Sequence, residues 1–237
     1  MSDLKLVLIK DVKSMLNKPL FVVGFPGIGL VGSIATTYLS KSSDFEMVGY
    51  FRSSKLAPLA AIHSYVPLPP IRLMASKKQN MLVLISEISI PMQLSDPFAE
   101  IILQLYKDLR ASYLVLMGGI NLNSNTNVYF VPSNNTVKKM AIDNVVGKLI
   151  KDGAVTGVTA LLLTLSKVNN YNTIALLGEA NPDYGDPRAT SNVIKAFNKL
   201  FKKSFNTKQL DKEAEELKKE LSEMNSKSDS FSPSMYG

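Results

Sequence analysis

The sequence predicts an α/β domain whose sheet is mostly parallel and is flanked by helices on both faces. Residues 20–24, 81–86, 113–117 and 173–177 are almost continuously apolar, a pattern typical of strands that are covered on both sides. Segments with helical spacing of apolar residues separate them. Strands that alternate with helices in this way indicate crossover connections, and therefore parallel pairing at the centre of the sheet.

The remaining elements are justified by spacing and by turn residues. Short strands are expected at residues 4–9, 46–51 and 128–131, and two more around the prolines of residues 60–74, because proline excludes a helix there. A helix is expected to begin at Asp96 and another at Asp186, since each aspartate is followed by proline and can cap a first turn. Two further helices are expected over residues 137–150 and 158–168.

The 237 residues divide into three parts by composition. Residues 1–206 are long enough for one α/β core domain. Residues 207–224 form an amphipathic helix whose apolar residues are spaced by 4, 3, 4 and 3, namely Leu210, Ala214, Leu217, Leu221 and Met224. Two heptads are too few for an independent coiled coil, so this face packs either on its own domain or on a sister subunit, with Leu210, Leu217 and Leu221 as oligomer contacts. Residues 225–237 are polar and are expected to form a flexible tail.

Composition excludes several classes of site. The chain has no cysteine and a single histidine, His63, which excludes disulfides and thiolate ligands and leaves no histidine cluster for a metal. No metal site or catalytic residue is therefore predicted. No apolar run reaches the length of a membrane span, and the N-terminus does not resemble a signal peptide. We expect a cytoplasmic protein with no membrane partner.

The glycine-rich segment after the first buried strand allows two interpretations. Residues 27–32 match G-x-G-x-x-G, which can hold a dinucleotide pyrophosphate at a helix N-terminus. That interpretation calls for an acidic residue after the next strand, where this chain has Arg52, a residue that could instead accompany a ribose phosphate. The second interpretation, a turn that needs glycine for close strand-to-helix packing, is favoured. A nucleotide-binding enzyme that uses the segment from Gly27 to Gly32 remains the alternative.

Other candidate residues also have two interpretations. Glu87 and Glu179 follow buried strands and could be paired carboxylates for acid–base chemistry, or could accept hydrogen bonds from loop backbone. The second is favoured, because no nucleophile with an adjacent base is recognisable. The net charge is +7, and Lys195, Lys199, Lys202 and Lys203 cluster near a helix end. Such lysines more often complement a helix dipole than bind phosphates, so no nucleic-acid partner is predicted.

Three segments together carry a family resemblance. The first is the glycine segment, with Gly24, Pro26, Gly27, Gly29 and Gly32. The second is residues 179–189, with Glu179, Pro182, Tyr184, Asp186 and Pro187. The third is residues 157–163, a glycine and small residues followed by three leucines. In this order, and over roughly residues 4–200, they resemble the proteasome assembly chaperone family of the second-chaperone type, and especially its archaeal B-type homologues. The second segment is one residue shorter than the family pattern between Tyr184 and Asp186, which leaves the shape of that loop open.

This resemblance implies a phosphorylase- or hydrolase-like fold without the activities of those enzymes. It implies an ATP-independent homotetramer that needs no cofactor and binds the α-ring of the proteasome core particle, as an assembly chaperone or an activator, with an unfoldase ring as a further possible partner. The absence of G-x-x-x-x-G-K-[ST] agrees with ATP independence. The sequence ends in Met235, Tyr236 and Gly237, which fit the hydrophobic-Tyr-any motif that docks in α-ring pockets.

Overall fold

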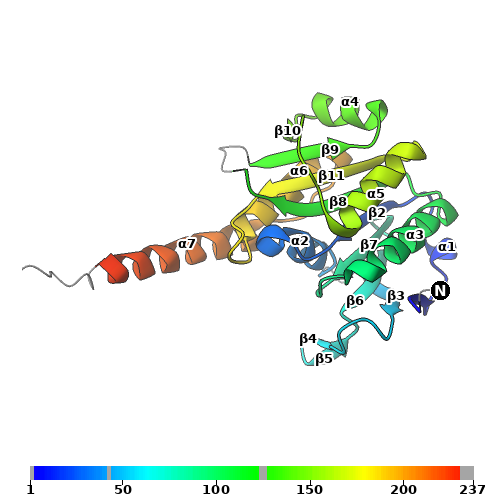
Figure 1. Ribbon diagram of the computed structural model, residues 1–237, viewed down its shortest axis with the longest axis horizontal. Coiled ribbons are helices and arrows are strands. Elements are labelled where there is room, and N and C mark those ends of the chain that lie inside the picture. Colours follow the sequence, from blue (N-terminus) through cyan, green and yellow to red (C-terminus); the bar gives the residue numbers. More distant parts are fainter. Residues whose placement is uncertain (1–2, 42–43, 123–126, 230–237) are drawn as a thin grey trace, which may run out of the picture.

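The computed structural model describes residues 3–41, 44–122 and 127–229. In this part of the chain, nine strands form one sheet with helices on both faces, which confirms the predicted α/β class (Figure 1). The strand order across the sheet is β1 (Lys5–Leu8), β3 (Glu46–Arg52), β6 (Ile71–Ser76), β7 (Met81–Ser86), β2 (Leu20–Gly24), β8 (Tyr113–Ile120), β11 (Thr173–Glu179), β9 (Val128–Pro132) and β10 (Lys148–Leu149). A separate hairpin contains β4 (Ala61–His63) and β5 (Val66–Leu68).

The centre of the sheet has the parallel arrangement that the apolar runs predicted. β2 pairs in parallel with both β7 and β8, so that Val22 lies opposite Val83 on one side and Val115 on the other. β11 continues the parallel block beside β8. The flanks add antiparallel pairs that the sequence analysis did not anticipate, at β1–β3, β3–β6, β6–β7 and β11–β9. Short turns such as the one between β6 and β7 permit only antiparallel pairing, since parallel strands need a long crossover.

The helices cover the two faces of the sheet because side chains alternate along each strand. Phe21 and Val23 of β2 point to the face covered by α1 (Val12–Met15), α3 (Met92–Asp108) and α5 (Gly157–Val168). Val22 points to the opposite face, where the core is completed by α2 (Val31–Leu39), α4 (Asn135–Asp143), α6 (Pro187–Phe201) and the start of α7 (Lys208–Asp229). A short 3-10 turn, η1 (Ile28–Leu30), lies within the glycine segment and leads directly into α2.

Two predicted boundaries on the N-terminal side are wrong. α3 begins at Met92 with Pro91 as its N-cap, and Pro97 lies inside the helix instead of at its start. The Asp96-Pro97 pair is therefore not the helix start. Pro97 is the sixth residue of α3, where proline has no amide to donate to the carbonyl oxygen one turn earlier, yet the helix continues through it. Residues 60–74 contain parts of three strands and not two, since β6 joins the main sheet after the β4–β5 hairpin.

Two boundaries on the C-terminal side also differ from expectation. The helix expected over residues 137–150 ends at Asp143, and β10 follows it. α7 continues to Asp229, so residues 225–229, which we assigned to the flexible tail, are helical. Their polar composition contains neither glycine nor proline, and extending an existing helix through such residues costs little.

Candidate functional site

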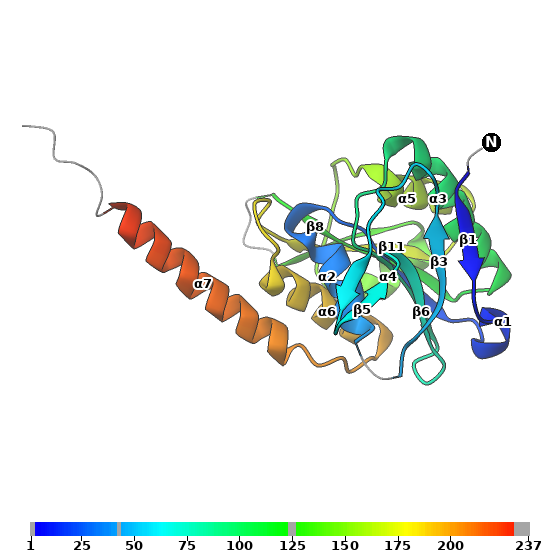
Figure 2. The ribbon, with the colours of Figure 1, turned by 90° about the horizontal axis from the view of Figure 1, so that it is seen from below.

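The glycine segment, the loop over residues 179–187 and the leucines of the C-terminal helix fall on three features of the described structure, and the C-terminal motif lies outside it. The glycine segment and the loop over residues 179–187 lie beside each other at the carboxyl ends of the central strands, and α7 extends from the same side of the domain (Figures 1 and 2). Met235, Tyr236 and Gly237 lie outside the described residues.

The glycine segment is packed too tightly for side chains at several of its positions. A Cβ at Gly32 would lie 2.5 Å from the Met117 carbonyl oxygen and 2.6 Å from that of Phe25. At Gly24, a Cβ would lie 2.1 Å from the Gly32 carbonyl oxygen. Gly29 has a φ of 60°, and its Cβ would lie 2.6 Å from the Cβ of Ala180. These glycines therefore allow β2, α2 and β8 to approach closely.

The glycine segment and the loop over residues 179–187 are joined by hydrogen bonds, although about 150 residues separate them in the sequence. The Asp186 amide donates to the Gly29 carbonyl oxygen at 2.8 Å. The Asp186 carboxylate accepts from the Asn181 amide at 3.2 Å, and from the Ala189 amide at 2.9 Å as the N-cap of α6. Asp186 thus closes its own loop, begins α6 and holds the glycine turn. Pro182 lies in the same loop.

The arrangement does not fit the dinucleotide interpretation of the glycine segment. In a dinucleotide-binding fold the ribose partner follows the strand next to the glycine turn. Here Arg52 ends β3, and β6 and β7 lie between β3 and β2, a separation of about 14 Å at the usual strand spacing. Gly29 and Gly32 face protein atoms, which supports the close-packing interpretation.

A partly buried ionic cluster lies at the end of β7, where sequence reasoning identified Glu87 but not its partners. Glu87 Oε1 accepts from Arg72 Nη2 at 2.6 Å and lies 2.8 Å from His63 Nε2. The Arg72 side chain is 3% exposed, and its Nη1 donates to the Pro69 carbonyl oxygen. His63, which lies on β4, therefore ties the β4–β5 hairpin to the end of β7. Its separation from Glu87 in sequence left no spacing signal.

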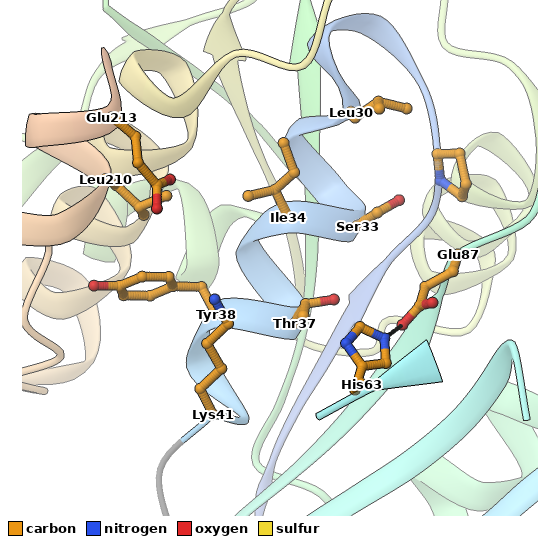
Figure 3. A pocket seen from close by; sticks show the side chains of 11 residues that line it. Leu30, Ser33, Ile34, Thr37, Tyr38, Lys41, His63, Glu87, Leu210 and Glu213 are labelled. Atoms are coloured by element: carbon orange, nitrogen blue, oxygen red, sulfur yellow. Dashed lines mark hydrogen bonds and ion pairs between the residues drawn. The ribbon is translucent and has the colours of Figure 1, made fainter. Parts of the chain in front are cut away.

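A cavity of about 290 Å³ lies between α2, the β4–β5 hairpin and the first turns of α7. Figure 3 shows Ser33 and Thr37 of α2 on the same side as His63 and Glu87, while Leu210 and Glu213 of α7 lie beyond Ile34 and Tyr38. Burial raises the pKa of the Tyr38 phenol above its ordinary value, and the negative charges of Glu213 and Asp211 act in the same direction. The cavity thus combines apolar walls with one polar end.

Glu179 has a different environment from Glu87. It ends β11 and accepts a hydrogen bond from the Leu122 amide at 2.8 Å, as the loop-holding interpretation predicted. Because β2 and β8 lie between β7 and β11, the two strands at whose ends these glutamates lie are about 14 Å apart. The two carboxylates do not form the acid–base pair considered from the sequence.

The base of α7 is anchored to α6 by Asp211, a residue that the sequence analysis did not identify. Its carboxylate accepts hydrogen bonds from Ser191 Oγ at 2.7 Å and from Lys195 Nζ at 2.9 Å. Arg188 Nη1 and Thr207 Oγ1 also donate to it, each at 3.3 Å. Partial burial acts to raise the pKa of Asp211, but the hydrogen bonds from Ser191, Lys195 and Thr207 and the charge of Lys195 keep it below its ordinary value.

We expect Asp211→Asn to loosen the junction between α6 and α7 by about 1 kcal/mol, because the amide keeps the shape but loses the charge-assisted bonds. Since the folded pKa is lowered, the carboxylate stabilises the junction above the unfolded pKa, and this stabilisation is lost as the pH falls through the folded pKa. Hydrogen exchange of the first turns of α7 measures both effects. Glu215→Gln, at a more exposed partner of Arg188, is the control and should change exchange little. Equal exchange in wild type and Asp211→Asn at neutral pH would contradict the anchor.

The leucine face of α7 divides between its own domain and open surface. Leu210 is 1% exposed and packs in the core with α2 and α6, so the expectation that it contacts a sister subunit is wrong. Leu217 and Leu221 are half-buried beside Tyr184 and Pro187, around a hollow of about 370 Å³. Beyond them α7 projects away from the domain in both views (Figures 1 and 2).

Three lysines of the basic cluster make contacts within the chain. Lys195 binds Asp211, Lys199 Nζ donates to the Val145 carbonyl oxygen, and Lys203 Nζ donates to that of Gln79 at 2.7 Å. Burial lowers the pKa of Lys203. These contacts agree with a structural role for the lysines.

Within the described residues, no three histidine, cysteine or acidic side chains gather where they could hold a metal ion. Over the same residues, no helix has the length and apolar character needed to cross a bilayer.

Comparisons with known proteins cover nearly the whole chain. A family model described as the PAC2 family matches residues 21–225. An uncharacterized protein of Methanocaldococcus jannaschii is 30% identical over 218 residues, which cover 91% of this chain and 89% of that protein. Pyrococcus furiosus PbaA, described as an archaeal homolog of proteasome-assembly chaperone, has a TM-score of 0.85 at 28% identity, over 96% of this chain and 94% of PbaA. P. furiosus PbaB, described as an archaeal proteasome activator, has the same fold, with a TM-score of 0.79 at 20% identity over 95% of this chain and 100% of PbaB.

Proposed function

Because the chain belongs to the PAC2 family, we propose that it binds the proteasome core particle as an assembly chaperone or an activator. The observation that carries the proposal is the match to PbaA, which is 28% identical and covers 96% of this chain. The protein acts by binding and not by catalysis, and it uses neither ATP nor a cofactor.

Binding takes place through the C-terminal residues Met235, Tyr236 and Gly237. The terminal carboxylate pairs with a lysine in a pocket between α-ring subunits, the Tyr236 ring enters the pocket, and Met235 adds apolar contact. The projection of α7 supports this proposal, because the helix extends away from the domain as far as Asp229 (Figure 2). The glycine segment and the loop over residues 179–187 fix the start of α6, and α6 in turn holds Asp211 at the base of α7.

Tyr236→Ala is expected to weaken binding to core particles about 30-fold or more, since truncating a buried interface tyrosine commonly costs about 2 kcal/mol or more. Co-sedimentation and peptidase activity of core particles measure the loss. A chain extended by glycines after Gly237 should lose binding equally, because the carboxylate is displaced.

Phe231→Ala is the matched control, an aromatic residue of the same segment that lies outside the motif. It should bind as the intact chain does. If Tyr236→Ala and the extended chain both bind normally, the tail proposal fails. If the intact chain does not bind core particles at all, the proposed function itself fails.

The chain acts as a homo-oligomer, with a homotetramer as the expected state, because several tails that bind together reach an avidity that one weak tail lacks. Leu217 and Leu221 are the contact residues that the structure leaves half-buried, and a projecting helix gains stability when such a face is covered. We expect the double variant Leu217→Ser and Leu221→Ser to lower the molar mass measured by light scattering at the same protein concentration.

Lys219→Ser, at an exposed position of α7, is the control and should leave the molar mass unchanged. An unaltered mass for the leucine double variant would place the subunit contact elsewhere, without affecting the tail experiment.

A further inference from the structure

The cavity shown in Figure 3 lies where α/β domains commonly bind ligands, outside the carboxyl ends of parallel strands. Glu87 follows β7, and Pro26 follows β2. Ile34 and Tyr38 of α2 face Leu210 of α7 across the space (Figure 3), and Leu30 of η1 also lines it. About 290 Å³ is at the small end of known ligand sites and suits a single apolar group.

The polar end of the cavity has hydrogen-bonding capacity that the described residues do not use. Ser33 Oγ is buried and has no partner in the described structure. Both contacts of Glu87, from Arg72 and His63, go to Oε1, so among the described residues Oε2 receives no donor. A buried hydroxyl without a partner costs free energy that a bound group could recover. The cavity therefore suits a group that both donates and accepts hydrogen bonds.

The charges around the cavity favour a neutral group. Arg72 already compensates Glu87, so a bound cation would meet the guanidinium charge nearby. Among the described residues that line the cavity, Glu87 and Glu213 carry carboxylates and Lys41 carries the one ammonium group. A negatively charged ligand would therefore meet two like charges and is also disfavoured. A backbone amide meets these requirements, because it is neutral and carries one donor and one acceptor.

The apolar surface continues beyond the cavity. Leu30 is 46% exposed at its mouth. Val66 lies directly opposite His63 in the hairpin ladder, hence on the same face, and is 53% exposed. A small molecule that filled the cavity would leave both uncovered, whereas an extended chain would cover them.

We propose that this cavity binds an extended peptide segment of a partner protein. One aliphatic or aromatic side chain of the segment occupies the space between α2 and α7, its backbone amide bonds to Ser33 and Glu87, and flanking residues cover Leu30 and Val66. This site is separate from the C-terminal motif, and its test needs no proteasome.

The single histidine of the chain provides a direct reporter, because its imidazole lines the cavity. The imidazole signals of His63 are followed by NMR in the full chain during titration with N-acetyl-leucine amide, N-acetyl-phenylalanine amide and N-acetyl-glutamate amide. The first two should shift the signals with a dissociation constant on the order of 1 mM, and the glutamate compound should not. N-acetyl-Ala-Leu-Ala-amide should bind several-fold more tightly than the single leucine unit.

Variants separate the parts of the proposal. Thr37→Phe should fill the cavity and abolish the shifts, whereas the matched change Thr164→Phe, at an exposed position of α5, should preserve them. Ser33→Ala should weaken binding, and Val66→Ser should remove only the advantage of the longer peptide. Melting curves confirm that each variant is folded. Absence of saturable shifts with the leucine and phenylalanine amides, or equal shifts in folded Thr37→Phe, would overturn the site. Equal affinities for the single unit and the tripeptide would overturn its assignment to a peptide segment.

Discussion

Gly32→Ala is expected to destabilise the protein by about 3 kcal/mol, the upper end of overpacking costs. The effect is opposite in sign to the gain of up to about 1 kcal/mol that alanine usually gives over glycine inside a helix. The reason is that the new methyl group would meet the backbone oxygens of Met117 and Phe25 at 2.5 and 2.6 Å, and backbone cannot rotate away as a side chain can. For a domain of this size the melting temperature should fall by about 6 to 12 °C.

Gly27→Ala is the matched control within the same motif. A Cβ at Gly27 meets nothing within 4 Å, and its φ of −170° is open to any residue. We expect a change within about 0.5 kcal/mol. A melting temperature for Gly32→Ala equal to that of wild type would show that α2 can move away from β8, and the close-packing interpretation would be wrong.

Glu87→Ala is expected to cost about 3 to 5 kcal/mol, because it leaves the Arg72 guanidinium, 3% exposed, without a counter-charge in the interior. Urea unfolding at constant m-value measures the change. His63→Ala removes the other partner of the same oxygen, but the imidazole is 41% exposed, so its loss should cost less than about 1 kcal/mol.

The double variant Arg72→Met with Glu87→Leu tests the cause of that loss. If an unpaired charge is responsible, replacing both charges by apolar side chains should recover most of the stability. A double variant as unstable as Glu87→Ala would instead show that the side-chain shape at Glu87, and not its charge, supports the hairpin.

The parallel centre of the sheet could be predicted because full burial imposes a continuous apolar sequence. Residues 81–86 of β7 are all buried, and such a run has few other interpretations. The antiparallel flank was harder to predict, since β3 mixes exposed, half-buried and buried positions without a regular alternation and its sequence does not indicate which strands pair with it. Strand pairing on that side is decided by turn length and by long-range packing.

The Asp-Pro pattern for a helix start occurs twice in the sequence, and it predicted the helix start correctly only once. Asp96-Pro97 and Asp186-Pro187 are equivalent as helix starts in sequence, but only the second pair begins a helix. Asp186 makes contacts outside its helix, to Gly29 and Asn181, which fix the chain at that point. Asp96 instead lies inside α3, because the helix already begins four residues earlier, at Met92.

In the candidate site, the sequence indicated where some residues lie but not which residues they contact. Glu87 could be located from its place after a buried strand, but its partners are 15 and 24 residues away, on strands whose arrangement the sequence left open. The anchor at Asp211 was missed because an aspartate at the start of a charged helix is usually solvated. Its role depends on Ser191 and Lys195 of α6, which no local pattern connects to it.

Because α7 is long, a small change in its angle at the base moves its C-terminal end a large distance. Its 22 residues span about 33 Å at 1.5 Å per residue. The Asp211 anchor and the buried Leu210 and Ala214 lie in its first two turns, and Leu217 and Leu221 farther along are half-buried. For a rigid helix of this length, a tilt of about 10° at the base of α7 displaces its C-terminal end by about 6 Å, roughly the rise of one helical turn. In the proposed oligomer, the angle at which a few contacts on α6 hold α7 would therefore decide how far apart the Asp229 ends of the helices lie, and with it the spacing of the pockets that the proposed tails could reach at the same time.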